Sequence, residues 1–547
     1  MRPVHAVPRL HRRAVVVGSG IAGLTAALEL GDCAVVTKTR LGEGASRWAQ
    51  GGIAAALGPD DDPARHAADT LAVAGGLADA EVVARLTAGA PDRIAWLQQL
   101  GASFDTERDG RGGGLALGRE AGHARRRIVR AHGDATGAAV MRALVAAVKA
   151  RPDVEVVQDT AVIDLLRAGE RVVGVLTVDA SGRRRALLAP AVVLATGGIG
   201  RVYAHTTNPV EATGDGLAMA TRAGAVVRDP EFVQFHPTVL DVDRDPRPLL
   251  TEALRGEGAT LVDVDGRRYL LDVHPDAELA PRDVVARANW QALRRGPIHL
   301  DARVIGERFP ERFPTVFDAA QQAGLDPRVD LLPVTPSQHY HMGGVRGDLA
   351  GRTSLPGLYV CGEVASTGLH GANRLASNSL VEGLVGGAQV AWAVRAEAVP
   401  VVTRDLEVAA GAGEVVGGPA ADGGVADGAV ADGAVADGGV ADGAVAALRR
   451  TMWQAAGLVR DGAGLRAGLD ELARLEPVLR TDLTGRNLAV VADLVLTAAL
   501  ERRESRGGHT RADYPEQAPG PPRHTELAPR EAARCAVVLD EQLAALP

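Results

Sequence analysis

The stretch Ala14-Val15-Val16-Val17-Gly18-Ser19-Gly20-Ile21-Ala22-Gly23 joins four apolar residues to a glycine-rich turn. The apolar run predicts a buried strand, and a helix is expected to follow over 24–30. Gly18 permits the tight turn, Gly20 lets the backbone approach a pyrophosphate, and Gly23 lets the helix pack closely on the strand. The stretch therefore predicts an α/β protein that begins with a dinucleotide-binding unit.

The residue after the second predicted strand departs from this pattern. That strand is expected over 34–37, and a carboxylate commonly follows it to hold the ribose of the nucleotide. Here the position is occupied by Lys38. Taken alone, the lysine favours NADP or a different contact to the ribose.

Two later segments bear on the choice of nucleotide. Residues 191–198 predict an apolar strand that ends in a glycine pair, and residues 357–363 predict another strand that runs into Gly362 and Glu363. Each segment alone is typical of an ordinary buried strand. Three such strands that return to one nucleotide are typical of a two-dinucleotide-fold (Rossmann-like) domain, so their order favours FAD.

The segment Leu369-His370-Gly371-Ala372-Asn373-Arg374-Leu375-Ala376-Ser377-Asn378-Ser379-Leu380 combines a histidine, an arginine and a helix start. The serines predict a helix N-terminus, with Glu382 completing a capping box. Free N–H groups there suit an anionic ligand or an anionic reduced flavin, and an arginine fork suits a carboxylate. A polar loop with one capped helix would explain the serines, but it leaves Arg374 and His370 without a role.

The composition of the 547 residues limits the function classes. A net charge of −8 argues against a nucleic-acid surface. The three cysteines are scattered without Cys-x-x-Cys spacing, which favours a reducing compartment and no metal site. Neither a secretory signal nor a run of about 18 uncharged apolar residues is found, so we expect a cytoplasmic protein without a membrane span.

Residues 421–445 contain five tandem copies of Ala-Asp-Gly-(Ala/Gly)-Val. Such copies lack the apolar surface needed to offset the entropy of ordering, so a flexible linker is favoured over a pentapeptide solenoid. We expect deletion of residues 405–444 to leave folding and activity nearly intact. Beyond it, periodicity over 448–479 and 487–503 predicts a small helical domain, followed by a polar tail after Pro515.

Several motifs in order resemble the flavoprotein family of succinate dehydrogenases, fumarate reductases and L-aspartate oxidases. These motifs lie at 49–54, 213–216, 235–238, 251–258, 280–283, 339–344, 370–380 and 504–507. The resemblance runs from the N-terminal strand to about residue 515, apart from the repeat. It implies an α/β FAD domain with an inserted α+β capping domain and a C-terminal helical domain.

The resemblance also implies a division of the chain. The expected parts are an FAD-binding domain over 1–231 and 346–400, a capping domain over 232–345, a repeat linker over 401–446, and a C-terminal helical domain with its tail over 447–547.

Two positions favour the L-aspartate oxidase branch of this family. Succinate dehydrogenase-like members attach FAD covalently through a histidine five residues before the glutamine of the Gln-Gly-Gly motif, and this position is Ala45 here. The segment 118–123 is similar to one whose glutamate faces a substrate amine, and it retains Glu120, although Ala121 stands where glycine is common. A fumarate reductase or succinate dehydrogenase flavoprotein subunit is the alternative. A non-catalytic FAD module or redox sensor is disfavoured by the full set of matched site residues.

The resemblance implies a role for each matched site residue. Arg282 corresponds to the family's proton-transferring arginine, in a relay with Glu252 and Arg255, although an arginine seldom loses its proton. The implied substrate contacts are Glu120, His236, Thr251, His339 and Arg374. The implied FAD contacts are Gly18, Ser19, Gly20, Ile21, Ala22, Gly23, Lys38, Ala45, Ser46, Arg47, Trp48, Ala49, Gln50, Gly51, Gly52, Asp215, Glu363, Ser379 and Leu380.

The implied reaction is the FAD-dependent oxidation of L-aspartate to iminoaspartate, the first step of de novo NAD biosynthesis. FAD is expected to be held non-covalently, and oxygen or fumarate to accept the electrons. Functional coupling to quinolinate synthase is also expected.

Overall fold

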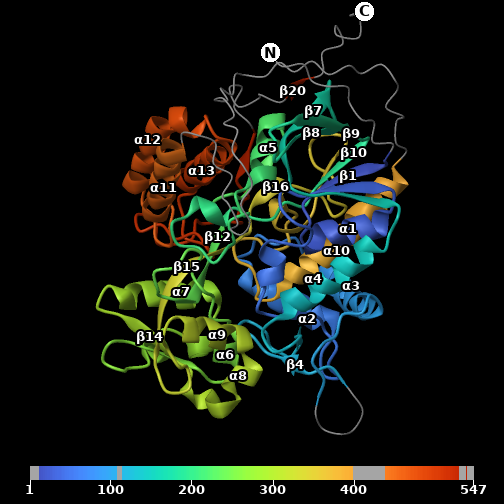
Figure 1. Cartoon of the computed structure of the whole chain (residues 1–547). Coiled ribbons are helices and arrows are strands. Elements are labelled where there is room, and N and C mark those ends of the chain that lie inside the picture. Colours follow the sequence, from blue (N-terminus) through green and yellow to red (C-terminus); the bar gives the residue numbers. More distant parts are fainter. Residues whose placement is uncertain (1–11, 108–113, 398–437, 529–536, 539–547) are drawn as a thin grey trace, which may run out of the picture.

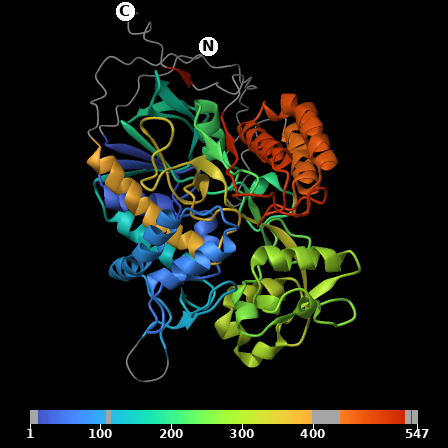
Figure 2. The same ribbon diagram turned by 180° about the vertical axis from the view of Figure 1, so that it is seen from behind.

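The structure, a computed structural model, describes residues 12–107, 114–397, 438–528 and 537–538. Figure 1 shows three groups of elements: a sheet with its covering helices, a separate group coloured yellow-green, and a bundle of orange-red helices. The same three groups are separate from behind in Figure 2.

The first group is organised around a parallel sheet in the order β17-β10-β1-β2-β6. The central strand β1 (Ala14–Val17) pairs with β2 (Cys33–Val36) and β10 (Ala191–Leu194). β17 (Leu358–Val360) extends the sheet beyond β10, and β6 (Val154–Val157) closes the other side. The three strands expected from sequence to share one nucleotide are therefore neighbours, and their carboxyl ends lie at one edge of the sheet.

One face of this sheet is covered by helices that pack closely on each other. α1 (Ile21–Leu30) and α10 (Asn378–Ala396) are in direct contact, because a Cβ added at Gly387 would lie only 2.6 Å from the carbonyl oxygen of Ala22. The other helices on this side are α2 (Pro63–Val73), α3 (Ala80–Gln99) and α4 (Thr136–Lys149).

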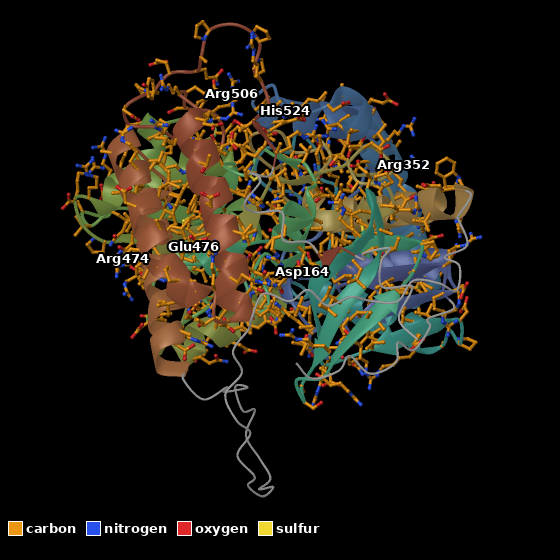
Figure 3. All side chains as sticks on the ribbon, turned by 90° about the horizontal axis from the view of Figure 1, so that it is seen from above. Asp164, Arg352, Arg474, Glu476, Arg506 and His524 are labelled. Atoms are coloured by element: carbon orange, nitrogen blue, oxygen red, sulfur yellow. The ribbon has the colours of Figure 1, made fainter. Side chains whose placement is uncertain are left out.

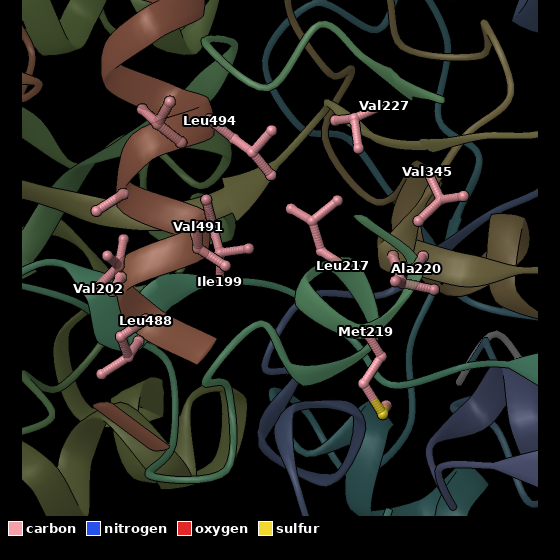
Figure 4. Close-up of a cluster of buried hydrophobic side chains, with 14 of the residues drawn as sticks. Ile199, Val202, Leu217, Met219, Ala220, Val227, Val345, Leu488, Val491 and Leu494 are labelled. Atoms are coloured by element: carbon pink, nitrogen blue, oxygen red, sulfur yellow. The ribbon is translucent and has the colours of Figure 1, made fainter. Parts of the chain in front are cut away.

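The opposite face packs on a second sheet and on α5 (Asp215–Ala223). That sheet contains β7 (Thr160–Ala168), β8 (Arg171–Asp179) and β9 (Arg184–Leu188), and β20 (Val537–Val538) joins β7. Figure 4 shows Leu217 of α5 facing the side of the C-terminal helix that carries Leu494, with Val491 close to Ile199. This apolar core joins the first group to the helical bundle.

The yellow-green group has a hydrophobic core of its own, formed by buried residues between 240 and 334. Its antiparallel sheet has the order β12-β15-β14-β13. β12 (Val233–Leu240) and β15 (Leu332–His341) connect it to the rest of the chain. Its remaining elements are β13 (Thr260–Val262), β14 (Ile298–Asp301), α6 (Ala253–Gly256), α7 (Arg282–Leu293), α8 (Phe309–Arg312), α9 (Pro314–Gln322), η3 (Tyr269–Asp272), η4 (Ala277–Leu279) and η5 (Arg303–Arg308).

The C-terminal bundle consists of α11 (Gly438–Ala455), α12 (Gly462–Leu479) and α13 (Leu483–Glu501). α13 is long and apolar enough to cross a membrane by length and composition, yet 61% of that stretch is buried inside the structure. It also carries Arg486, which contacts Asp164 of β7; Asp164 is labelled in Figure 3. α13 is thus a core helix of this fold.

The expected linker ends earlier than residue 446. α11 begins at Gly438, so the last repeat copy is helical, and Ala444 is buried. Side-chain packing against α12 and α13 supplies the stability that the repeat composition lacks. The rest of the repeat lies outside the described residues.

The expected polar tail also contains ordered pairing. β19 (Glu526–Leu527) pairs with β11 (Val227–Arg228), in a sheet of order β18-β16-β11-β19. His524, labelled in Figure 3, lies 2.6 Å from a carboxylate oxygen of Asp229. The remaining short elements are β3 (Ile53–Ala54), β4 (Leu117–Gly118), β5 (Ile128–Val129), β16 (Gly344–Arg346), β18 (Ala365–Ser366), η1 (Ala45–Trp48), η2 (Gly200–Val202) and η6 (Gly362–Val364).

The arrangement changes the expectation for the linker. α10 and α11 lie on opposite sides of the molecule (Figures 1 and 2), and a chain of n residues reaches at most about 3.6 Å × n. We therefore predict that replacing residues 405–437 with a Gly/Ser segment of equal length preserves the melting temperature and turnover, because only the length is needed.

Deleting residues 405–444 is expected to lower the melting temperature and turnover, contrary to the sequence-based expectation. An equal-length replacement that lowers the melting temperature as much as the deletion would contradict this.

Candidate active site

A cavity of about 730 Å³ opens at the carboxyl edge of the parallel sheet and continues between it and the yellow-green group. It brings together most of the site residues expected from sequence. On the nucleotide side its walls include Gly18, Ser19, Gly20, Ile21, Ala22, Lys38, Ala45, Ser46, Trp48, Ala49, Gln50, Gly51, Gly52, Asp215, Glu363, Ser379 and Leu380. On the opposite side they include Glu120, His236, Thr251, Glu252, Arg282, His339 and Arg374.

The glycine turn after β1 forms one end of this cavity. Gly18 has a φ of +108°, and a Cβ there would lie 2.2 Å from the carbonyl oxygen of Ala195, so a side chain is excluded. Gly23 does not line the cavity; a Cβ there would lie 2.0 Å from the carbonyl oxygen of Gly18. The turn leads into the N-terminus of α1, whose unpaired N–H groups suit a pyrophosphate.

Lys38 is explained by a partner that is distant in sequence. Its ammonium group lies 2.7 Å from a carboxylate oxygen of Asp215 and donates to Thr213. Although burial opposes ionisation, Lys38 holds the pKa of Asp215 below its ordinary value. The lysine charge is therefore already compensated, which removes the argument for a 2′-phosphate and NADP.

The Gln-Gly-Gly segment follows η1 along the cavity wall. Ala45 lines the cavity at the position where a histidine would be needed for covalent attachment. Arg47 is not on the wall, and its guanidinium group pairs with Glu43 at the surface. The expected contact from the Arg47 side chain is therefore not provided by this arrangement.

The N-terminus of α10 forms the opposite wall, but its capping differs from expectation. The helix begins at Asn378, and Ser377 precedes it with a left-handed φ of +60° and no capping bond from its side chain. Glu382 does not close a capping box, because its carboxylate instead accepts from Tyr340 and contacts His370. The helix start was predicted correctly and the capping box was wrong.

The nucleotide side of the cavity fits FAD. The side-chain oxygens of Gln50 and Thr196 are buried there without a hydrogen-bond partner among the described residues. Burial raises the pKa of Glu363 to about 7. Gly51 and Gly52 let the backbone face the cavity at the end near the arginines, where a flavin ring would meet a substrate.

Two buried arginines face the far end of the cavity and share one acceptor. Arg282 at the start of α7 and Arg374 both donate to Oε1 of Gln234, at 3.0 Å and 2.9 Å. Arg374 also donates to Ser379 at 3.1 Å. Two fixed guanidinium groups provide separate binding points for two carboxylates.

Glu252 and Arg255 support Arg282 from behind. Glu252 accepts from Nε of Arg282 at 2.5 Å and lies 3.5 Å from a guanidinium nitrogen of Arg255. Burial opposes ionisation of Glu252, but the two arginines keep its pKa below the ordinary value. Arg255 is buried and does not line the cavity, so it can act only through Glu252.

Glu120 is a buried residue at this end of the cavity and not a solvated loop side chain. Its Oε2 accepts from Ser377 at 2.7 Å, and its Oε1 has no partner among the described residues. A Cβ added at Gly51 would lie 3.4 Å from that free oxygen, so the carboxylate sits beside the Gln-Gly-Gly segment. Burial and the charge of Glu252 raise the pKa of Glu120, which an approaching ammonium group would lower again.

His236 and His339 are neutral hydrogen-bonding groups. Their rings lie 5.1 Å apart, and burial followed by the charge of Arg282 lowers the pKa of both well below the usual value. Nδ1 of His339 is fixed by Thr207 at 2.8 Å, and Nε2 of His236 is buried without a partner among the described residues. Thr251 lies on the same wall.

Three residues that contact the arginines or Glu120 were missed from the sequence; Ser377 and Tyr340 line the cavity, and Gln234 lies behind its wall. Gln234 bridges the arginines, Ser377 orients Glu120, and Tyr340 lies beneath Arg374 with 4.4 Å between the guanidinium carbon and the ring centre. Strand alternation could have found Gln234, because it precedes His236 by two residues and shares its face of β12.

We predict that FAD leaves the polypeptide completely on acid precipitation, because Ala45 has no atom that can form a covalent bond to the flavin. The measurement is the visible absorbance of the supernatant and of the redissolved pellet. A yellow pellet would contradict the prediction.

Comparisons with known proteins agree with this geometry. Residues 13–380 match the family described as FAD binding domain, and residues 445–533 match the family described as fumarate reductase flavoprotein C-term. The chain is 47% identical to L-aspartate oxidase of Caulobacter vibrioides over 92% of this chain and 93% of that one. It is 44% identical to L-aspartate oxidase of Streptomyces coelicolor, over 91% and 88%.

Solved structures show the same fold. The FrdA subunit of E. coli quinol fumarate reductase, in a Glu-to-Gln variant, superposes with a TM-score of 0.81 at 29% identity over 94% of each chain. Sdh1 of Mycobacterium smegmatis gives a TM-score of 0.74 at 29% identity, over 98% of this chain and 99% of that one. The chain belongs to the L-aspartate oxidase family, within the FAD-binding flavoproteins that include the fumarate reductases.

Proposed function

We infer that this chain is an FAD-dependent oxidase that converts L-aspartate to iminoaspartate. The observation that supports this inference most strongly is the oxygen of Glu120 that has no partner among the described residues, set beside Gly51 in the part of the cavity that Arg282 and Arg374 also line. An α-amino dicarboxylate presents one ammonium and two carboxylate groups, and these side chains complement all three.

Binding orients the substrate for the reaction. Arg374 holds one carboxylate in the plane set by Ser379 and Gln234. The second carboxylate is received by Arg282, with His236, His339 and Thr251 as neutral hydrogen-bonding partners. Glu120 faces the amine and sets which carbon lies toward the Gln-Gly-Gly segment. Bound FAD would supply the redox chemistry, as the acceptor of the hydride that leaves the α-carbon of the substrate.

Proton handling is assigned to the residues beside the substrate. The amine must lose a proton as the imine forms, and the free oxygen of Glu120 is placed to receive it. Arg282 binds and polarises the carboxylate. In the fumarate-reducing direction, Glu252 and Arg255 form a buried route by which a proton can reach Arg282.

The alternative, a fumarate reductase or succinate dehydrogenase flavoprotein subunit, is less well supported. The fold is shared, but Ala45 cannot attach FAD covalently and Glu120 has no partner in a substrate without an amine. The same dicarboxylate contacts would still admit fumarate, so fumarate and oxygen are both proposed as electron acceptors.

The product defines the proposed biological setting. Iminoaspartate is short-lived in water, so we propose direct use by quinolinate synthase in NAD biosynthesis, in the cytoplasm. No resident metal is assigned, since the described residues form no cluster of three or more His, Cys, Asp or Glu side chains that could hold one.

Steady-state turnover tests the function. Incubation of the holoenzyme with L-aspartate and oxygen should release ammonia and oxaloacetate, the hydrolysis products of iminoaspartate, in equal amounts. D-Aspartate is the matched control and should give neither product. Turnover of succinate at a higher rate than L-aspartate would favour the alternative.

A further inference from the structure

His370 is the one prominent residue of the 369–380 segment that the proposed mechanism does not use. It is buried, it does not line the cavity, and its Nε2 lies 3.1 Å from Oε2 of Glu382 on α10. The same oxygen accepts from the hydroxyl of Tyr340 at 2.5 Å, and that hydroxyl lies 3.3 Å from the histidine nitrogen. The three side chains form a closed buried triangle, referred to below as the Tyr340 triad.

The tyrosine of this triad packs against Arg374 of the binding site. The guanidinium carbon of Arg374 lies 4.4 Å from the centre of the Tyr340 ring, within the range of a cation–π contact. The ring of Tyr340 lines the cavity, whereas His370 and Glu382 lie behind it. The triad therefore reaches the substrate only through Arg374.

Arg374 needs such support, because it forms no ion pair with the described residues. Only Ser379 and Gln234 accept from it, and its Nε is buried without a partner among the described residues. Burial and the nearby charge of Arg282 lower the pKa of Arg374 to about 10. An aromatic face stabilises a desolvated cation without neutralising it, so the charge stays available for a ligand carboxylate.

The carboxylate behind the ring strengthens this contact. Burial and Glu382 raise the pKa of Tyr340 well above its usual value, so the phenol keeps its proton and donates a hydrogen bond to Glu382. A hydroxyl that donates to an anion makes its ring more electron-rich, and a buried chain of hydrogen bonds enhances this polarisation. His370 holds the acceptor oxygen in place.

We propose that Tyr340, oriented by Glu382 and His370, is a positioning residue that sets the plane of the Arg374 guanidinium and stabilises its charge for one carboxylate of the substrate. The proposal rests on the proposed dicarboxylate site. It assigns a role to the Tyr340 triad that differs from core packing.

The test is the affinity of the holoenzyme for succinate, which has two carboxylates and no amine. Binding is measured by calorimetry and by the change in the flavin spectrum without oxygen.

Tyr340→Leu should raise the Kd for succinate about tenfold to thirtyfold, the range for a desolvated cation–π contact. Tyr340→Phe and Glu382→Gln should each raise it about threefold, and their combination should do no more, because both remove the same hydroxyl–carboxylate bond.

The chain offers a matched control in a second tyrosine–glutamate pair, formed by Tyr359 of β17 and Glu397, the residue that follows α10. Tyr359 donates to Glu397 at the far end of α10, away from the cavity. Tyr359→Phe should leave the succinate Kd unchanged. His370→Leu should match Glu382→Gln, while His370→Gln, which keeps a donor, should stay close to the parent protein.

A pH profile separates charge stabilisation from a general structural effect. The charged and titratable groups that face Arg374 are Arg282, Glu252, Glu363, Tyr340, His236 and His339. Succinate binding is lost as pH rises through the pKa of the guanidinium. Loss of the aromatic face lowers that pKa further, so the alkaline midpoint should fall by about one pH unit in Tyr340→Leu.

The measurements on the Tyr340 and Tyr359 variants decide whether the proposal holds. An unchanged Kd and alkaline midpoint in Tyr340→Leu, or equal effects of Tyr359→Phe and Tyr340→Phe, would overturn the proposal. If Tyr340→Leu does not retain FAD, the isosteric Tyr340→Phe and Glu382→Gln decide it. A parent protein that binds succinate but does not oxidise aspartate would refute the proposed function and leave the Tyr340 comparison valid.

Discussion

In the Arg282→Leu protein, L-aspartate turnover is expected to fall by roughly 10³-fold or more, the size of effect seen when a charged donor or proton-transfer group is lost from an active site. FAD binding should survive, because the side chain of Arg282 contacts Glu252 and Gln234 and not the glycine turn after β1. The measurement is kcat/KM together with FAD content.

Arg294→Leu is the matched control for this substitution. Arg294 lies exposed at the C-terminal end of the same helix, so its loss should leave both quantities unchanged. Steady-state constants in Arg282→Leu that equal those of the control would remove Arg282 from the site.

Glu120→Gln is expected to lower kcat/KM for aspartate about 100-fold, within the range for breaking a buried charge pair, while fumarate reduction changes little. Glutamine keeps the shape and can still accept from Ser377, so packing is preserved. Fumarate has two carboxylates and no amine, and its contacts to Arg282 and Arg374 remain. Both reactions are measured in the same variant.

Glu278→Gln provides the control for a buried glutamate outside the cavity. The carboxylate of Glu278 pairs with Arg268, away from the cavity. Its replacement should change aspartate oxidation and fumarate reduction equally, if at all. Equal losses of both activities in Glu120→Gln would assign Glu120 a role in folding or closure, and unchanged activities would exclude it from the site.

The parts predicted well from sequence depend on local patterns. The apolar runs at 14–17, 191–194 and 358–360 form adjacent parallel strands. Continuous apolar runs are typical of parallel strands that are buried on both faces of a sheet. The glycine turn can be predicted locally, since Gly18 has a φ of +108° and a Cβ at Gly23 would lie 2.0 Å from the carbonyl oxygen of Gly18, although Ala195 adds a distant constraint at Gly18.

The parts predicted poorly depend on distant partners. Lys38 was ambiguous because its partner Asp215 lies 177 residues away. The capping box failed because Tyr340 and His370 take Glu382, a tertiary contact that local propensity does not register. Burial of Glu120 and the shared acceptor Gln234 likewise follow from packing between segments that are distant in sequence.

The last repeat copy is ordered by distant contacts that its own sequence does not predict. Its composition predicts a linker, yet residues from Gly438 onward are helical because α12 and α13 supply an apolar surface for Ala444 and Leu448. Tertiary packing outweighs a weak helix propensity when such a surface is present.

The central claim is that this site oxidises an amino dicarboxylate, and anaerobic mixing of the holoenzyme with L-aspartate or succinate tests it most directly. L-Aspartate should bleach the flavin absorbance, whereas succinate should perturb the spectrum without bleaching it, because only the first ligand gives Glu120 an amine partner. Bleaching by succinate with no bleaching by L-aspartate would contradict the account.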